Sequence, residues 1–364
     1  AQHATVSHTA SLAGSDAGAA ALLDGLGIAR VHDLPGLLET LKLLHVYGRL
    51  SSSLLSSISC SGGEASLAAD TAHGRGVSFP PLETAQRDAL REALGPMVAL
   101  SNPLDYNTYV WRDVEKMTAA WLPMAADHIG LTLIIVDYPH TDASDWECAT
   151  QAALNVRAVS GRPVAVVATL PELMPADVMD RLMAGGVVPV CGLREAVVAA
   201  EAAAFDARPD PAAPLLAGPD RAAHLMTEAE AKAVLAAFGL RVPRGEVAYT
   251  PAEAAAIAAT FGAPVVLKGQ GLAHKSEAGA VLIGVLPPEV EAAAAGMNAP
   301  SYLVEEYIDA PVAELLIGVT RDSAHGFLLT LGAGGVLTEL WADTVSLLLP
   351  VTPGQIETAL TRLR

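Results

Sequence analysis

Residues 54–204 alternate between short apolar runs of strand length and longer segments whose apolar residues recur at helical spacing. Nearly continuous apolar strands separated by amphipathic helices predict a parallel sheet that helices cover on both faces. The pattern therefore predicts a doubly wound α/β domain, which binds ligands at the carboxyl ends of its strands. The expected strands are 54–60, 96–100, 131–137, 163–169 and 187–192, and the expected helices are 64–74, 144–159, 175–186 and 194–205.

The segments on either side have different patterns. The chain begins as a loop of small residues and continues with apolar residues at helical spacing over 14–28 and 31–48. After the alternating region, residues 206–222 are rich in proline and alanine and have little helical or strand period, which indicates a linker between domains.

The pattern after residue 222 predicts a second domain of the α+β class. Thr227 and Glu230 have the spacing of a capping box, and Gly239 is expected to end the helix that they begin. Thr250 and Pro251 open another helix. Antiparallel strands are expected over 264–271, 281–286, 301–308, 313–320 and 325–335. The expected boundaries are thus 1–45, 46–205, a linker over 206–222, and 223–364.

Composition excludes several classes of protein. The 364 residues suffice for two or three domains, and the net charge of −18 argues against a nucleic-acid-binding surface, which needs a basic patch. No run approaches the roughly 18 apolar residues of a membrane span, and no signal peptide is evident. Cys60, Cys148 and Cys191 are widely spaced, so we expect three buried thiols in a reduced, cytoplasmic setting.

A glycine-rich turn joins an expected strand to an expected helix at Ser61, Gly62 and Gly63. Free amide groups at a helix N-terminus can bind an anion, and glycine lets the anion approach closely. An ordinary tight turn between strand and helix explains the same residues about equally well.

A second candidate follows the apolar strand that ends at Lys268. A lysine there is costly to bury unless it meets an anion, and Gly269 lets backbone amides approach a phosphate. His274 and Lys275 lie in the next turn. A solvated hairpin loop with ordinary charges explains this pattern equally well.

Glu305 and Glu306 lie within an apolar run, and Glu314 begins another. Such carboxylates can accept from a purine amino group or hold a metal, although exposed edge charges that discourage aggregation are the commoner explanation.

His8 stands alone among small residues in ATVSHTASLAGSDAG, residues 4–18. A neutral imidazole is a nucleophile near pH 7, and small neighbours leave room for a bulky group on it. A phosphorylated His8 would need helix N-termini around it, and the 61–63 turn is one candidate. A surface or packed histidine is the commoner explanation.

Four stretches, in this order, resemble motifs of the NDP-forming acyl-CoA synthetases, which include ADP-forming acetyl-CoA synthetase and succinyl-CoA synthetase. They are SHTASLAGSD, like the family's phosphohistidine loop; SCSGGEASLAAD with SNPLDYN, like its SGG turn and NPVD segment; VVLKGQGLAHKSEAGAV, like part of its ATP-grasp domain; and GFLLTLGAGGVLTEL, like its FGLGGVFVE segment. The resemblance covers nearly the whole chain. It implies a flavodoxin-like, succinyl-CoA synthetase-like domain and an ATP-grasp domain, with residues 1–45 ending the domain that carries the phosphohistidine loop.

The resemblance implies ATP-dependent joining of a carboxylic acid to CoA, with ADP and phosphate as products, through acyl phosphate and phosphohistidine intermediates. It implies that His8 is the phosphohistidine and that His274 is the ATP-side histidine that shuttles the phosphoryl group. ATP, Mg²⁺ and CoA are the implied cofactors and substrates, and a homo-oligomer is expected. The sequence does not indicate the metal ligands or which acid is used.

The same resemblance implies roles for the two turns. Lys268 would bind ATP phosphates, with Lys275 beside it, and Glu306 would lie near the adenine. The amides of residues 61–63 would receive the phosphohistidine. Tyr106, just after the NPLD segment, and Tyr109 either line an acyl pocket or pack, with packing slightly favoured.

Some family segments have no counterpart in the sequence. The family's CoA-binding domain and its ELDINP segment with Mg²⁺ ligands are not found, so we expect the chain to be part of a longer protein. One alternative function is a regulatory or protein-acyltransferase-type relative that binds CoA or nucleotide without synthetase activity. Another is an ATP-grasp ligase that joins a carboxylate to an amine. The presence of both His8 and His274 favours the synthetase.

Overall fold

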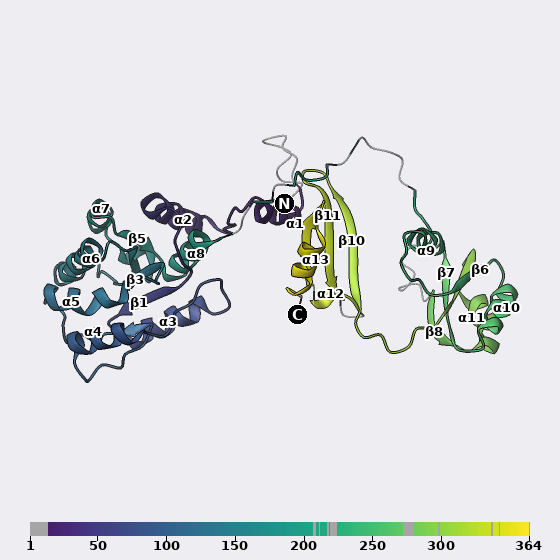
Figure 1. Ribbon diagram of the computed structural model, residues 1–364, viewed down its shortest axis with the longest axis horizontal. Helices are drawn as coiled ribbons and strands as arrows, with labels where there is room; N and C mark the ends of the chain where they lie inside the picture. The colour runs from purple at the N-terminus through teal and green to yellow at the C-terminus, as the bar shows by residue number, and fades with distance from the viewer. Residues whose placement is uncertain are drawn as a thin grey trace. The chain divides into compact units, whose positions relative to one another are not determined.

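The computed structural model describes residues 14–206, 209–210, 212–216, 218, 224–271, 280–297, 299–335, 338–341 and 343–363. The chain divides into two compact units, and the main division falls between Leu215 and Leu216. The first unit also includes Thr320–Leu328 and Ser346–Val351. Figure 1 shows the elements along the chain.

The first unit contains a parallel sheet of five strands among the described residues, in the order β2-β1-β3-β4-β5. This is the strand order of flavodoxin-like domains, so the predicted doubly wound α/β class is confirmed. Every residue of β1, β3 and β4 is buried, as the nearly continuous apolar runs of β3 and β4 predicted. The strands are β1 Leu55–Ser59, β2 Leu104–Asp105, β3 Leu131–Ile135, β4 Val164–Ala168 and β5 Val188–Cys191.

Helices cover both faces of this sheet. Successive side chains of a strand point to opposite faces, so the apolar strands need cover on each side. Leu133 and Ile135 of β3 join one apolar core with α2, α3 and α8, whereas Ile134 joins a second core with α4, α5, α6 and α7 (Figure 1). The helices are α2 Leu34–Tyr47, α3 Gly62–Ala72, α4 Thr84–Leu94, α5 Val114–Trp121, α6 Glu147–Ser160, α7 Ala176–Ala184 and α8 Leu193–Ala204.

The expected strand at 96–100 is wrong, because those residues form a turn and irregular backbone. The side chain of Asn102 explains where pairing begins. Its Nδ2 donates to the carbonyl of Leu55 at 2.9 Å, and its Oδ1 accepts from the amide of Ser57 at 3.1 Å. The backbone of Ser78 bridges Leu54 just before these bonds, so Ser78 and the side chain of Asn102 together occupy this edge of β1 until β2 pairs with it.

The two N-terminal helices are shorter than their apolar patterns. The pattern over 14–28 corresponds to α1 Asp16–Gly25, and the pattern over 31–48 corresponds to α2. Ser15 caps α1 by accepting from the amide of Gly18 at 3.0 Å. Asp33 caps α2 in the same way. The caps, rather than the apolar residues, set where each helix starts.

A polar joint links the start of α1 to the turn after β10 Leu315–Asp322, within the first unit. The amide of Ser15 donates to Asp322 Oδ2 at 2.7 Å, and His325 Nδ1 lies 2.9 Å from Asp322 Oδ1. The amides of Ala324 and His325 also donate to Asp322, at 2.9 Å each. These donors hold the pKa of the Asp322 carboxyl well below its usual range against the opposing effect of burial.

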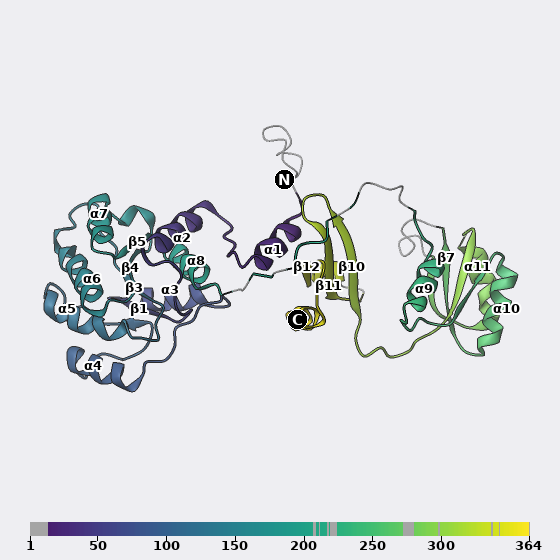
Figure 2. The same cartoon turned by 45° about the horizontal axis from the view of Figure 1, so that its top comes forward.

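The second unit contains an antiparallel sheet of the α+β class, with the order β6-β9-β7-β8 among the described strands. The apolar face of β7 and β9 packs on α10 and α11 (Figure 2). The expected capping box of Thr227 and Glu230 is present, and Thr250 caps α10. The elements are α9 Glu228–Ala237, β6 Gly245–Ala248, α10 Pro251–Phe261, β7 Val265–Gln270, β8 Val281–Val285, α11 Val290–Gly296 and β9 Ser301–Glu306.

A further sheet has the strand order β10-β11-β12. The expected strands over 313–320 and 325–335 thus correspond to β10 and β11. The remaining elements are β11 Gly326–Ala333, α12 Thr338–Trp341, β12 Thr344–Leu348 and α13 Pro353–Leu360. None of the helices in the described part of the chain is long and apolar enough to cross a bilayer.

Candidate functional site

Ser61, Gly62 and Gly63 lie at the carboxyl edge of the parallel sheet, between β1 and α3. Ser61 is the N-cap residue, and no side chain of the described residues caps this helix. Both glycines are exposed. Because the first amides of a helix have no intrahelical partner, this end of α3 can accept an anion. That the anion is a phosphoryl group stays a prediction.

Carboxyl groups surround this helix N-terminus. A Cβ placed on Gly62 would lie 3.3 Å from Asp105 Oδ2, which shows how near Asp105 comes to the turn. Burial, followed by the charges of Asp137 and Asp105, raises the pKa of Glu64 to about 7. Glu64 Oε2 is shielded and accepts no hydrogen bond from the described residues. A protonated Glu64 reduces the repulsion that an arriving anion meets here.

Neighbouring strand ends hold these groups in place. Asp137, just after β3, accepts from the amide and the hydroxyl of Thr169 at 2.7 and 2.6 Å. Cys60, just after β1, is exposed, so the expectation of three buried thiols is wrong for this residue. Partial burial of its sulfur, followed by the charge of Glu64, raises the pKa of the Cys60 thiol above its ordinary value. A raised pKa lowers the fraction of the reactive thiolate form.

The tyrosines that follow β2 differ in their surroundings. Tyr106 is 2% exposed and packs edge-to-face on Trp121, with ring centroids 5.5 Å apart. Tyr109 is 74% exposed. The prediction that they pack is thus confirmed for Tyr106 and wrong for Tyr109.

Lys268 lies in β7 and is joined by ion pairs to three other side chains. Its Nζ lies 2.5 Å from Glu228 Oε1 and 2.9 Å from Glu305 Oε2. Lys232 Nζ lies 2.9 Å from Glu228 Oε1 and 2.5 Å from Glu305 Oε1. These four residues are hereafter the ion-pair ring. They bring together α9, β7 and β9.

The ring lies on the face of the sheet opposite the apolar core. Val265 and Leu267 of β7 are core residues, so Lys268 points to the other face. Val266 pairs with Glu305 in the antiparallel register, which places Glu305 diagonally across from Lys268. Figure 2 shows α9 on this side of β7, opposite α10 and α11.

Of the two adjacent glutamates at the end of β9, only Glu305 faces Lys268. Glu305 is 2% exposed, so its description as an exposed edge charge is wrong. Glu306, the residue predicted near the adenine, accepts from the amide of Arg244 at 3.0 Å and pairs with its Nε at 3.2 Å. These bonds hold the pKa of Glu306 below its ordinary value.

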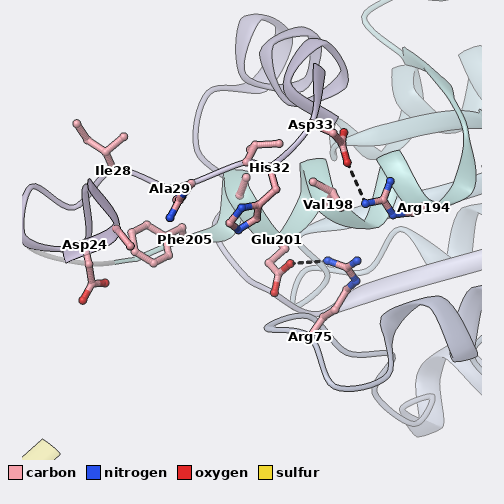
Figure 3. Close-up of a pocket in the computed structure, with 14 residues that line it drawn as sticks. Asp24, Ile28, Ala29, His32, Asp33, Arg75, Arg194, Val198, Glu201 and Phe205 are labelled. Carbon is pink, nitrogen blue, oxygen red and sulfur yellow. Dashed lines mark hydrogen bonds and ion pairs between the residues drawn. The ribbon is translucent and has the colours of Figure 1, made fainter. Parts of the chain in front are cut away.

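A cavity of about 430 Å³ lies between α8 and the segment from α1 to α2 (Figure 3). Its Arg75 pairs with Glu201 at 3.1 Å, and its Arg194 pairs with Asp33 at 2.9 Å. The lining includes none of the predicted site residues that the structure describes. Because each guanidinium already faces a carboxylate, this cavity is a weaker candidate for binding an anion.

Three predicted site residues, His8, His274 and Lys275, lie outside the described residues. Within the described ranges, no group of three or more histidine, cysteine or acidic side chains is arranged to hold a metal ion.

Glu228 was not predicted as a site residue from the sequence. Its signal was the spacing of Glu228 and Lys232, four residues apart, which places the two side chains on one face of a helix. That spacing alone does not show that β7 and β9 lie against the same face.

Comparison with known proteins gives a match to a protein family and similarity to individual proteins. Residues 219–364 match a family described as an ATP-grasp domain. The chain is similar to the β subunit of ADP-forming acetate–CoA ligase II of Pyrococcus furiosus, with 32% identity over 152 residues, 38% of this chain and 64% of that protein.

A further relative and a solved structure are also similar to this chain. A trans-feruloyl-CoA synthase of an unknown prokaryotic organism is 26% identical over 370 residues, which cover 94% of this chain and 51% of that protein. A solved structure of acetyl-coenzyme A synthetase 1 of Ca. Korarchaeum cryptofilum is 28% identical, covers 38% of this chain and 66% of that one, and has a TM-score of 0.36. The chain thus spans 64% and 51% of the two curated relatives.

Proposed function

The chain belongs to the NDP-forming acyl-CoA synthetase superfamily, and we propose that it forms part of an ADP-forming acid–CoA ligase. In the proposed reaction, ATP, CoA and a carboxylic acid give an acyl-CoA, ADP and phosphate. The proposed enzyme divides one condensation into phosphoryl-transfer steps that each need mainly positioning and neutralisation of charge.

One combination of features in the chain carries the proposal. The flavodoxin-like sheet presents, at its carboxyl edge, the N-terminus of α3, which no described side chain caps. The ATP-grasp domain carries Lys268 on β7. A helix N-terminus suits the oxygens of a phosphoryl group, and a lysine on a strand suits the phosphates of a nucleotide.

The proposed steps use two histidines as carriers. The imidazole of His274 attacks the γ-phosphorus of ATP, so that an N–P bond forms as the P–O bond to ADP breaks. The phosphoryl group passes to His8 and then to the carboxylate of the acid, giving an acyl phosphate. The CoA sulfur attacks the acyl carbon, and phosphate leaves. The amides of residues 61–63 are proposed to stabilise the phosphoryl oxygens during transfer through His8.

Mg²⁺ is proposed to accompany the phosphates of ATP, where it neutralises charge. No described residue is assigned to it. Relatives named as β subunits, in Pyrococcus furiosus, support assembly with further subunits or copies. Light scattering of the complete protein measures that assembly.

Phosphoryl labelling tests the proposal directly. The complete protein is incubated with γ-labelled ATP and Mg²⁺, with His8→Ala and His274→Ala alongside. We expect a base-stable, acid-labile label that is lost in His274→Ala and is confined to His274 in His8→Ala. Addition of CoA with acetate, 4-hydroxybutyrate, succinate or ferulate, the acids in the names of relatives, should discharge the label with the correct acid.

An unlabelled protein, with and without these acids, would contradict the ligase and favour a regulatory relative that binds CoA or nucleotide. A label that survives in His274→Ala would contradict the order of the two carriers.

A further inference from the structure

Lys268, on which the proposed nucleotide site depends, is already bound by the two glutamates of the ion-pair ring. Lys268 is 19% exposed, and it lies within 2.9 Å of both Glu228 and Glu305. The side chain of Glu305 is 3% exposed, so this side of the ring is buried from solvent. Two lysines and two glutamates make the ring neutral as a whole.

Among the described residues, the helix that brings Glu228 packs only lightly on the sheet. None of the residues of α9 is buried. Phe238, just after the helix, is 81% exposed, and Val234 and Leu235 are 44% exposed each. Besides the ring, a bond of 3.4 Å joins the amide of Ala229 to Gln270 Oε1 on β7. Ionic contacts thus contribute a large share of the docking of α9.

A phosphate group and the carboxylate of Glu228 would both bind the ammonium group of Lys268. An ammonium group has three donors, and two already point at carboxylates. A phosphate that approaches the remaining donor meets the negative charge of Glu228, 2.5 Å from the same nitrogen. Glu305 is buried in β9 and cannot withdraw, whereas Glu228 sits in the first turn of a weakly packed helix.

We propose that Glu228 acts on the nucleotide site as a positioning residue, by competing with nucleotide phosphate for Lys268. Docking of α9 on the sheet and binding of nucleotide therefore oppose each other. This inference rests on the proposed function, because it takes Lys268 to be a phosphate-binding residue. By linkage, whatever holds α9 on the sheet weakens nucleotide binding, and nucleotide loosens α9 by the same factor. Lys232 keeps a carboxylate partner in either state.

Calorimetric titration of ADP into Glu228→Gln and into the unchanged protein tests the competition. Glutamine keeps the size of the side chain and removes its charge, so we expect the Kd for ADP to fall about three- to tenfold. The matched control is Glu230→Gln, on the same turn of α9. It removes the same charge and keeps the capping box with Thr227, since glutamine serves at that position. Its Kd should stay at the value of the unchanged protein.

Hydrogen exchange gives a second readout that does not depend on the variant. The amides of α9 should exchange faster in the presence of saturating ADP than without it. Equal or weaker ADP binding by Glu228→Gln, or slower exchange of α9 with ADP, overturns the competition while the proposed function stands. An unchanged protein that binds no ADP overturns the proposed nucleotide site and the competition with it.

Discussion

The backbone amide of Ser15 donates to the carboxylate of Asp322 at 2.7 Å, across 307 positions of the sequence. The same carboxylate binds the turn that follows β10 and orients the ring of His325. His325 in turn lies against the start of α1, where a Cβ on Gly14 would come within 2.3 Å of the imidazole. A buried carboxylate and a glycine-lined surface therefore fix the N-terminus of α1 to a turn from the far end of the chain.

Gly18→Ala should loosen this joint. The added Cβ would lie 2.7 Å from Nδ1 of His325, whose ring is held by Asp322 and cannot turn away freely. Overpacking of this kind costs about 1–3 kcal/mol. Hydrogen exchange of the α1 amides should accelerate accordingly. Gly25→Ala, in the same helix with nothing within 4 Å of its added Cβ, should slow exchange instead, because alanine is the better helix former. If both changes altered hydrogen exchange of the α1 amides equally, the ring of His325 would be shown to move aside for the added Cβ.

Glu64→Gln should stabilise the first unit increasingly as the pH rises. The folded-state pKa of about 7 exceeds the ordinary value of 4.5, so between these pH values the folded protein keeps a proton that the unfolded chain has lost. Stability of the unchanged protein therefore falls from pH 4.5 to 7 and then levels off. After allowance for solvent screening, the variant should gain about 1–2 kcal/mol above pH 7 and little at pH 4.5.

Urea unfolding at pH 5 and pH 8 measures this gain. Glu92→Gln, at an exposed position of α4, is the control and should show no such dependence. A gain that is the same at both pH values would contradict a raised pKa at Glu64.

Lys268→Met and Glu228→Gln should be strongly non-additive. Removal of Lys268 leaves Glu228 and Glu305 facing each other with Lys232 as their remaining partner in the ring. The second change relieves that repulsion, and contacting charges usually couple by about 0.5–3 kcal/mol. A double-mutant cycle on the unfolding free energy gives the coupling. The parallel cycle of Lys268→Met with Glu230→Gln should be additive within about 0.5 kcal/mol.

Asn102→Ala should destabilise the first unit. The change leaves the carbonyl of Leu55 and the amide of Ser57 without their bonds to the Asn102 side chain, and an unsatisfied buried group costs about 1–3 kcal/mol. Ser101→Ala removes a bond to Pro103 at the neighbouring exposed position and should change stability by less than about 0.5 kcal/mol. Chemical unfolding followed by circular dichroism compares the two. A similar loss in both variants would assign the effect to the loop rather than to Asn102.

The parallel sheet could be predicted because its strands are buried on both faces, so that runs such as 131–137 are apolar at nearly every position. The run at 96–100 has the same appearance, yet the edge of β1 before β2 is taken by the backbone of Ser78, which bridges Leu54, and then by the side chain of Asn102. A hydrogen bond between a side chain and a distant backbone has no period, and the sequence pattern cannot reveal it.

The candidate site was predictable to a similar extent. The turn at Ser61 and the lysine at 268 follow from local sequence, since each depends on residues next to it in the chain. The opposite positions of Glu305 and Glu306 depend on which face of β9 meets α9, and this is a tertiary property. For the same reason Glu228 was not predicted, because its role depends on β7, forty residues later.

Both margins of the parallel sheet resist joining another sheet. On one side β2 has only two residues, and on the other β5 contains Pro189, which has no amide hydrogen to donate. The carbonyl of Pro189 is already bound by Lys42 at 2.7 Å. A multidomain chain keeps its parts at high local concentration, where strand exchange between copies would lead to aggregation. Because β2 and β5 offer little free backbone for strand pairing, copies of this domain can lie close together without their sheets joining edge to edge.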